Sequence, residues 1–489
     1  MKNKDLLQHI WLFCTRRQKG QLLIVLIITV LSAFAEVISV GAIIPVLTLI
    51  FSPNEILSFL PKYGFNILSG FSSDKVQILI ILVFTFAVIV SISLRVLVIH
   101  LTNAFAFNFS ARLSNQLLKG ALSANYQFHI GGRSNEMLST LNKVQAIGNE
   151  IVAKVISGFA SIVVSVVILL FLSFIDTWLT LIFISFIVSG YVMISMLQRR
   201  SLDRISKKMP DANDNRIKYL TESMDGIKDI MLFDLVDYYS DRFKFHNNRF
   251  FTSLAQSVTL SSVPRFFMEG VAIFAFGFIS YFQKISGATG TEVLTLLGVF
   301  ALSAQKLLPQ AQMMYSSWAS IKASTGMAAD VFLMLKSLKT VSRSKPSKLD
   351  FEKNICLENV CYSYNAKAPY IIKNVDLIID KGDLVAVVGQ SGSGKSSLIN
   401  LIMALIVPTS GDIAVDDISM CWRTGSGWWR HISHVSQNTF VHGGSFLENI
   451  CFDKNQENID QQRLDKIIEI CELNEVVSQK EGGLEELLG

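Results

Sequence analysis

The sequence predicts an α-helical membrane domain with six transmembrane helices, joined to a C-terminal α/β domain built around a phosphate-binding loop. Three observations support this fold class. The chain is 51% hydrophobic and only 17% charged, whereas soluble domains carry roughly 25% charged residues. Six long apolar runs occupy its first two thirds. A glycine-rich string, GQSGSGKSS, follows among short apolar runs.

Each of the six apolar runs is long enough to cross a bilayer, which requires about 20 mostly apolar residues. Only isolated charged residues interrupt the runs, and Asp176 separates the third from the fourth. The predicted spans are Leu22–Phe51, Val76–Leu94, Val155–Ile175, Thr177–Gln198, Val258–Gln283 and Val293–Ile321.

Basic residues predict the orientation of these spans, because cytoplasmic loops carry an excess of lysine and arginine. They are concentrated before Leu22, in Phe105–Lys154 and in Arg199–Arg249, whereas the Asp176 turn and Lys284–Glu292 contain few. The N-terminus, both long loops and the C-terminal domain are therefore predicted to be cytoplasmic. The net charge of +5 belongs to these loops, so no nucleic-acid partner is predicted.

The two long loops are predicted to be helices that continue out of the membrane. Ala111–Leu141 and Asp203–Phe251 have a helical spacing of apolar residues and few breakers. Gly131–Gly132 and Gly226 would form turns within them. The external segment Ser52–Lys75 mixes apolar residues with proline, glycine and asparagine, which suggests a short amphipathic helix on the outer surface.

The remaining composition signals are weaker. No cleavable signal peptide is evident, because the first apolar run is too long and no small-residue cleavage site follows it. Six cysteines are scattered without the paired spacing of metal ligands, so reduced thiols are expected. A polar segment rich in serine and lysine, 336–353, is predicted to link a membrane domain, 1–335, to a nucleotide-binding domain, 354–489.

The string Gly389–Ser397 matches the phosphate-binding pattern G-x-x-x-x-G-K-[ST]. Its glycines let backbone N–H groups turn towards phosphate oxygens, Lys395 supplies a positive charge, and the Ser396 hydroxyl is placed for Mg²⁺. The apolar run Leu384–Val388 before it is predicted to be a buried parallel strand, and Ser397–Ile406 a helix whose N-terminus faces the anion. The predicted nucleotide-binding residues of the loop are Gly389, Gln390, Ser391, Gly392, Ser393, Gly394, Lys395, Ser396 and Ser397.

Other short apolar runs are predicted to be strands of the same domain. Their arrangement predicts a sheet with both antiparallel and parallel strands. These runs are Ile355–Val360, Ile371–Ile379, Gly411–Val415 and His431–Val435.

Six spans, long cytoplasmic extensions and a C-terminal phosphate-binding domain together resemble a half-transporter of the ATP-binding cassette (ABC) exporters, over the whole chain. The resemblance implies that ATP and Mg²⁺ are cofactors and that the chain forms a homodimer. Tyr364, in NVCYSY, matches the aromatic residue that stacks on adenine in this family. Gln437, in HVSQNTF, matches the glutamine that reaches Mg²⁺ and the attacking water, which makes it the candidate catalytic residue.

The resemblance also indicates elements that this sequence lacks. The chain stops at Gly489, just before the point where relatives carry the LSGGQ-type signature, the acidic strand with a catalytic glutamate, and a switch histidine. Phosphoryl transfer depends on several such groups. The nucleotide-binding domain is therefore expected to be incomplete at the C-terminus and to hydrolyse ATP negligibly, whether the chain is a fragment or a shortened product. A nucleotide-binding membrane protein without turnover is the alternative of another class.

Within the exporters, several short strings are similar to bacterial lipid-linked oligosaccharide flippases. They are Pro264–Gly270, Val299–Gln312, Gln127–His129 and Gly226–Asp234. This resemblance implies ATP-driven movement of a polyprenyl-diphosphate-linked oligosaccharide from the inner to the outer leaflet of the bacterial inner (plasma) membrane. Export of another lipid or of a peptide is the alternative within the transport class.

Five ionisable residues interrupt or adjoin the predicted spans: Glu36, Arg95, Arg265, Glu269 and Lys306. Ionisable groups at membrane depth are costly and usually face a cavity or a partner. Arg265, next to Pro264, is the first candidate to bind an anionic headgroup, and Arg95 is the second. The alternatives are snorkelling to the interface and, for Arg265, a pair with Glu269 one helical turn away.

Overall fold

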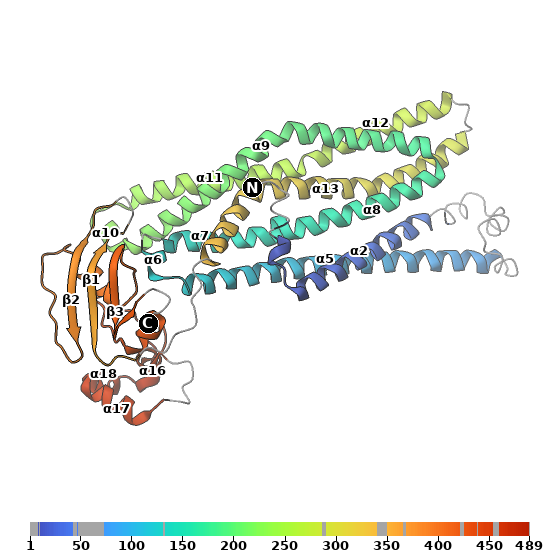
Figure 1. The fold of residues 1–489 in the computed structure, drawn as a ribbon. Helices are drawn as coiled ribbons and strands as arrows, with labels where there is room; N and C mark the ends of the chain where they lie inside the picture. The colour runs from blue at the N-terminus through green and yellow to red at the C-terminus, as the bar shows by residue number, and fades with distance from the viewer. Residues whose placement is uncertain are drawn as a thin grey trace. The chain divides into compact units, whose positions relative to one another are not determined.

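A computed structural model of the chain separates into two compact units, Met1–Ser344 and Lys345–Gly489, called here the membrane unit and the nucleotide unit. Figure 1 shows the helices of the first and the sheet of the second. The structure describes residues 10–42, 73–130, 133–285, 290–339, 350–364, 368–420, 425–437, 439–452 and 459–488, with Gln8 and Val46. Of the predicted external segment Ser52–Lys75, residues 52–72 lie outside these residues and 73–75 begin a long helix. The predicted Gly131–Gly132 turn also lies outside them.

The membrane unit consists mostly of long helices. Its helices are α2 (Arg16–Gly41), α5 (Ser73–Leu122), α6 (Tyr126–His129), α7 (Arg133–Ala146), α8 (Ala153–Ile175), α9 (Thr177–Asp225), α10 (Ile227–Leu232), α11 (Val236–Ser262), α12 (Pro264–Ile285) and α13 (Gly290–Lys339). A π-helical segment, η2 (Ile147–Val152), joins α7 to α8.

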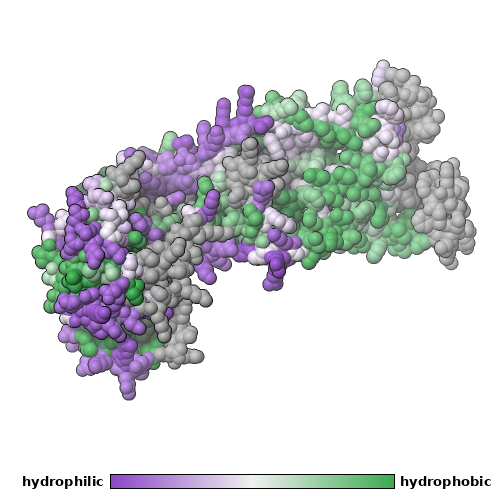
Figure 2. Space-filling model, viewed as in Figure 1, coloured by the Kyte–Doolittle hydropathy of each residue, from purple (hydrophilic) through white to green (hydrophobic). Residues whose placement is uncertain are grey.

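Five helical stretches of the described residues are long and apolar enough to cross a membrane, judged by length and composition. The sixth predicted span, Val293–Ile321, lies within α13. Apolar side chains cover the halves of α5, α8 and α12 that lie away from α7 and α10 (Figure 2). Polar side chains gather over α11 and the neighbouring part of α9 (Figure 2).

The longest helices continue well beyond their apolar spans, as the sequence predicts. α5 contains 50 residues and α9 contains 49, so each is roughly 75 Å long at 1.5 Å per residue. The hydrocarbon core of a bilayer is only about 30 Å thick. The parts of α5, α7, α9, α11 and α13 outside the apolar spans are called the extensions below. The predicted turn at Gly226 is confirmed, because α9 ends at Asp225 and α10 begins at Ile227.

The extensions are held together by an apolar core and by charge. Phe109, Leu113 and Leu117 of α5 are fully buried beside Ile147 and Ile151 of η2. Next to this core, the Lys143 Nζ of α7 lies 2.6 Å from a carboxylate oxygen of Asp214 on α9 and 2.6 Å from one of Asp330 on α13. The Lys143 side chain is only 2% exposed. A single buried ammonium therefore joins three helices.

At Gly326, α13 lies very close to α9. A Cβ atom there would collide with the Ser206 carbonyl oxygen and would lie 2.8 Å from Pro210 Cγ. We expect Gly326→Ala to destabilise the protein by about 1–3 kcal/mol, because the two helices would have to separate. Gly270→Ala on α12 is the matched control, since a Cβ there meets no atom within 4 Å. Thermal unfolding in detergent measures both, and equal midpoints would contradict this close packing.

The nucleotide unit contains a four-stranded antiparallel sheet in the order β2-β1-β3-β4. Its strands are β1 (Asn354–Tyr362), β2 (Ile372–Asp380), β3 (Ser410–Val415) and β4 (Ile418–Ser419). The main helices that follow are α14 (Lys395–Ile402), α16 (Phe446–Cys451), α17 (Gln461–Ile470) and α18 (Asn474–Ser478). Short turns, α15 (Gly425–Trp428), η3 (Trp429–His431) and η5 (Gly483–Glu485), complete it. Three of the five predicted strands therefore correspond to β1, β2 and β3, with shifted ends.

Two of the strand predictions are wrong, because the segments form no backbone hydrogen bonds with any strand that the structure describes. Leu384–Val388 and His431–Val435 form no strand in the structure, and Leu384 and Val388 are 101% and 92% exposed. A strand requires a neighbour for its backbone hydrogen bonds, and no described strand pairs with either segment. The prediction of a buried parallel strand before the loop is thus corrected.

Two boundaries are also corrected. The predicted helix Ser397–Ile406 corresponds to α14, which begins at Lys395 and ends at Ile402. Residues 336–339, predicted to belong to the linker, are the last turn of α13. The structure describes only 350–353 of the rest of the linker.

Candidate nucleotide-binding site and membrane cavities

The phosphate-binding loop depends on glycines at two left-handed positions. Gly392 has a φ of 80° and Gly394 a φ of 91°, a region that other residues rarely adopt. A Cβ on Gly394 would also lie 2.9 Å from side-chain atoms of Ile371 and Ile372. The loop therefore needs glycine at Gly394 for both backbone conformation and space.

The loop leads into the N-terminus of α14, where backbone donors remain available. Gly394 caps the helix without a side-chain hydrogen bond, and the first internal bond runs from the Leu398 N–H to the Gly394 carbonyl, 2.9 Å. The N–H groups before Leu398 have no partner inside the helix. Such N–H groups at a positive helix end are suited to bind phosphate oxygens.

Lys395 lies at the centre of this loop. Its Nζ donates to the carbonyl oxygens of Gly389 and Gln390, at 2.7 Å in each case. The ammonium group thus lies against the loop backbone that would surround a phosphate. Ser396, the predicted Mg²⁺ ligand, is exposed beside it at the first turn of α14.

Tyr364 is held against the loop although it lies 25 or more residues before it in the chain. Its hydroxyl is 3.0 Å from the buried Ser397 hydroxyl. Its ring packs edge-on against Tyr362, with centroids 5.1 Å apart. Burial, and then the neighbouring Tyr364, raise the pKa of Tyr362. The structure therefore brings the predicted adenine-stacking residue and the loop together, and Tyr364 remains 37% exposed.

Gln437 is exposed in the segment that follows η3. Among the described residues, no hydrogen bond joins Gln437 to the phosphate-binding loop. Its proposed role with Mg²⁺ and water therefore stays a prediction.

In the membrane unit, Arg95 does not stand alone: with Lys306 it forms a charge cluster around the buried Glu36 carboxylate, and both cations are partly exposed. The Glu36 carboxylate of α2 is 5% exposed and lies 3.8 Å from Arg95 of α5 and 3.7 Å from Lys306 of α13. Thr29, Ser32 and Gln310 contribute polar groups to the same cavity of about 110 Å³. The sequence identified these three charged residues individually, but not that three helices bring them together.

Arg265 lies in a separate and larger cavity, of about 490 Å³, lined by η2, α8, α9, α11, α12 and α13. Its Nε is 3.1 Å from the Glu269 carboxylate, so the pair on one helix that the sequence allowed is present. The cavity also contains Lys154 and Glu150. Its polar lining is mostly serine, from Ser257, Ser261, Ser262, Ser316, Ser320 and Ser324. Sequence reasoning missed Lys154 and the serines, although the serines on α13 recur every four residues.

Comparison with known proteins agrees with this arrangement. Residues 22–302 match the family model of the ABC transporter transmembrane region, and residues 372–484 match the ABC transporter family model. The fold is also similar to the solved structure of a bacterial Atm1-family ABC exporter with ATP bound, with a TM-score of 0.71 and 15% identity. That similarity covers 97% of this chain and 81% of the other.

Curated relatives match shorter segments. An ABC transporter ATP-binding protein of Mycoplasma pneumoniae is 32% identical over 215 residues, which are 40% of this chain and 33% of the relative. An ATP-dependent lipid A-core flippase of Pectobacterium atrosepticum is 25% identical over 285 residues, 58% of this chain and 49% of the flippase. The chain thus spans between a third and a half of the length of these relatives.

The membrane-region model alone covers more than half of the chain, and the fold agrees with an exporter of known structure. The predicted family is confirmed: the chain belongs to the ABC transporters and combines a membrane unit of the exporter fold with an ATP-binding unit.

Proposed function

We propose that the chain is one half of an ATP-driven exporter that moves an amphiphile with an anionic headgroup across a bacterial inner membrane. The cargo is a polyprenyl-diphosphate-linked oligosaccharide, carried from the inner to the outer leaflet. The observation that carries this proposal is the serine-lined cavity with Arg265 and Lys154 on its wall. Similarity to a lipid A-core flippase supports a lipid cargo.

The physical argument concerns the cost of moving a diphosphate out of water. A buried anion without a partner is very unfavourable, so the pathway must supply cations or donors. Arg265 and Lys154 would supply positive charge, and the serine hydroxyls would supply hydrogen-bond donors without large side chains. The polyprenyl tail would remain in lipid. Arg95, held by Glu36, would belong to the same pathway only if Glu36 released it.

ATP would bind at the nucleotide unit through the phosphate-binding loop, with Tyr364 on the base. The described residues contain no group of three or more His, Cys, Asp or Glu side chains able to hold a metal. The residues that would hold Mg²⁺ are Ser396 and Gln437, together with the phosphates of the nucleotide, as is common in nucleotide sites. When bound, the metal would neutralise phosphate charge.

The test of the cargo proposal is a flipping assay in vesicles, with the chain in a form that includes the signature and acidic strand of the family. We expect Arg265→Ala to reduce ATP-driven flipping of a polyprenyl-diphosphate sugar by about tenfold or more, because the anion loses a charged hydrogen-bond donor. ATP binding should be unchanged. Arg242→Ala, on the α11 extension, is the control.

A second variant distinguishes cargo binding by Arg265 from the ion pair that Arg265 forms with Glu269 on the same helix. Glu269→Gln removes the partner of Arg265 and leaves the cation, so flipping should be retained. If Glu269→Gln and Arg265→Ala reduce flipping equally, Arg265 acts through its ion pair with Glu269 and does not bind the cargo. If the wild-type protein moves no lipid-linked sugar but exports another amphiphile or a peptide, the cargo proposal is wrong and only the exporter class remains.

We also propose that the exporter is a homodimer. Six spans are half of the pathway of this family, and the turn between α9 and α11 carries apolar side chains that the single chain leaves exposed. Met231, Leu232 and Phe233 are 69%, 70% and 70% exposed there, which is typical of an interaction site. This turn would contact the nucleotide unit of the second copy.

We expect crosslinking in membranes to give a dimer, and Phe233→Asp to weaken it severalfold, because a charge would be buried at the contact. Leu12→Asp is the control, since Leu12 is equally exposed, at 75%, but far along the chain from this turn. Monomer alone in the wild type, or equal dimer in both variants, would contradict the proposed contact.

A further inference from the structure

A third cavity in the membrane unit has an apolar wall and a basic end. This groove, of about 630 Å³, runs between α9 and α13. Its apolar side chains include Val188, Val192 and Met196 of α9 with Met314, Tyr315 and Trp318 of α13. Arg199 and Lys322 lie at its end. Its volume is within the range of about 300–1,000 Å³ that is typical of small-molecule sites.

The basic end of the groove carries uncompensated positive charge. Lys322 is neutralised, because its Nζ lies 2.6 Å from the Asp203 carboxylate. Arg199, Arg200 and Arg204 are exposed on α9, and none of them forms an ion pair among the residues that the structure describes. The groove is therefore electrostatically suited to an anion at one end only.

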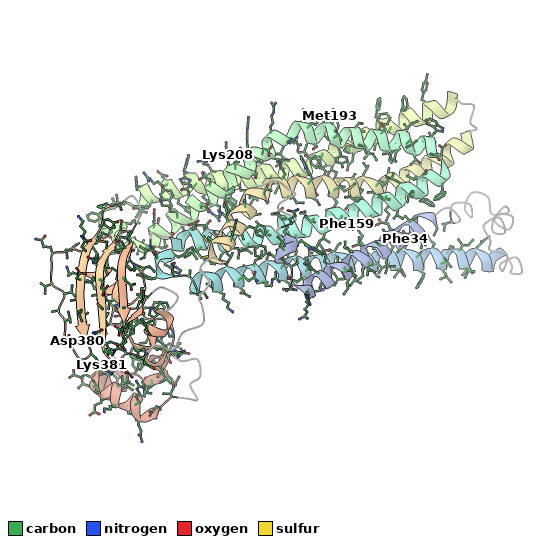
Figure 3. The ribbon with its side chains drawn as sticks, viewed as in Figure 1. Phe34, Phe159, Met193, Lys208, Asp380 and Lys381 are labelled. Carbon is green, nitrogen blue, oxygen red and sulfur yellow. The ribbon has the colours of Figure 1, made fainter. Side chains whose placement is uncertain are left out.

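The position of these arginines along α9 matches the boundary of a bilayer. From Thr177 to Gln198, α9 contains no charged residue, and this segment is roughly 33 Å long, close to the hydrocarbon thickness of about 30 Å. Met193 lies in this apolar part and Lys208 in the extension of the same helix (Figure 3). The first arginine follows directly after Gln198, at the level of lipid headgroups.

Aromatic side chains on α13 lie near the same boundary between lipid and water. Tyr315 donates its hydroxyl to the Gln198 side-chain oxygen at 2.5 Å, and its ring packs on Trp318, with centroids 5.7 Å apart. Tryptophan and tyrosine are enriched where a membrane meets water. The apolar part of the groove, its aromatic pair and Arg199 thus succeed one another along the groove, in the order of a lipid tail, an interface and a headgroup.

We propose that this groove binds an anionic glycerophospholipid of the cytoplasmic leaflet as a resident ligand. An acyl chain lies along Val192, Met196 and Met314, and the phosphate contacts Arg199, with Arg200 and Arg204 adding attraction. The assignment to the cytoplasmic leaflet depends on the predicted orientation of the chain. The lipid is distinct from the cargo, because Arg265 lines another cavity and no side chain of this groove belongs to that one.

Trp318 provides a direct readout. The full chain is placed in phosphatidylcholine vesicles that contain an increasing fraction of brominated phosphatidylglycerol, whose bromine quenches a nearby indole. The signal of Trp318 is the difference between the wild type and Trp318→Phe. Brominated phosphatidylcholine in unbrominated phosphatidylglycerol is the reverse experiment. We expect phosphatidylglycerol to quench Trp318 at a much lower fraction than phosphatidylcholine does.

The triple variant Arg199→Gln/Arg200→Gln/Arg204→Gln should need more brominated phosphatidylglycerol for the same quenching of Trp318. We expect the required lipid fraction to rise about fivefold for each arginine removed. The matched control Lys228→Gln/Lys244→Gln/Lys336→Gln removes three exposed lysines of α10, α11 and α13 and should leave this fraction unchanged. Equal quenching by both lipids, or equal shifts in both triple variants, would overturn the proposal.

Two other occupants give different results. If helices of a second copy cover the groove, no brominated lipid quenches Trp318, and the proposal fails. If the groove is a cargo site, a polyprenyl diphosphate displaces phosphatidylglycerol from it in wild type and in Arg265→Ala alike, because Arg265 does not line the groove, and the proposal fails again. Neither result depends on flipping, so failure of the lipid site and failure of the cargo proposal are distinguishable.

Discussion

Replacing Lys395 by alanine is expected to weaken ATP binding on the order of 100-fold, because the variant loses a charged hydrogen-bond donor at the centre of the phosphate-binding loop. The Lys395 Nζ lies 2.7 Å from two carbonyl oxygens of that loop, so a phosphate bound by the loop would lie beside it. Binding of labelled ATP to purified wild type and variant measures the effect.

Lys381→Ala is the control for this measurement. Lys381 follows β2, next to Asp380 (Figure 3), and is exposed, so its removal changes the net charge equally without touching the loop. ATP binding should be unchanged in this variant. Equal affinity of Lys395→Ala and wild type would show that the loop is not the nucleotide site.

Replacing Lys143 by methionine is expected to destabilise the membrane unit by about 2 kcal/mol. Removing one partner of a fully buried ion pair costs about 3–5 kcal/mol, but Asp214 and Asp330 are 46% and 38% exposed, so water screens part of the loss. The variant leaves two carboxylates close together without a cation. Thermal unfolding in detergent gives the change in stability.

A triple variant tests whether charge is the cause. Lys143→Met with Asp214→Asn and Asp330→Asn removes the repulsion as well as the attraction, so it should be more stable than Lys143→Met alone. Lys322→Met removes a more exposed lysine, 23%, from a single pair with Asp203 and should cost less. If the triple variant is no more stable than the single one, packing of the lysine side chain matters and its charge does not.

Local pattern was sufficient to predict the phosphate-binding loop and most of the helices. The positions of Gly392 and Gly394 in the motif require left-handed backbone, and both have it. Apolar periodicity likewise predicted that α5 and α9 extend past the membrane. The run Leu384–Val388 has the composition of a buried strand, but composition cannot supply the neighbouring strand that its hydrogen bonds require.

Contacts between distant segments were beyond sequence reasoning. The Arg265–Glu269 pair could be predicted because helix geometry places residues four apart on one face. Glu36 is 59 residues before Arg95, and only the packing of α2 on α5 and α13 brings these charges together. Lys143 gave no signal in sequence, since a lysine in a polar helix is usually solvated. Its burial depends on which faces of α7, α9 and α13 meet.

The most direct test of the proposed exporter is ATP-driven flipping of a fluorescent polyprenyl-diphosphate sugar in vesicles, with the chain in a form that includes the signature and acidic strand of the family. We expect flipping that requires ATP, that Lys395→Ala abolishes and that Arg265→Ala reduces while leaving ATP binding intact. Flipping that continues in Lys395→Ala, or none in the wild type under conditions where ATP is bound and hydrolysed, would contradict it.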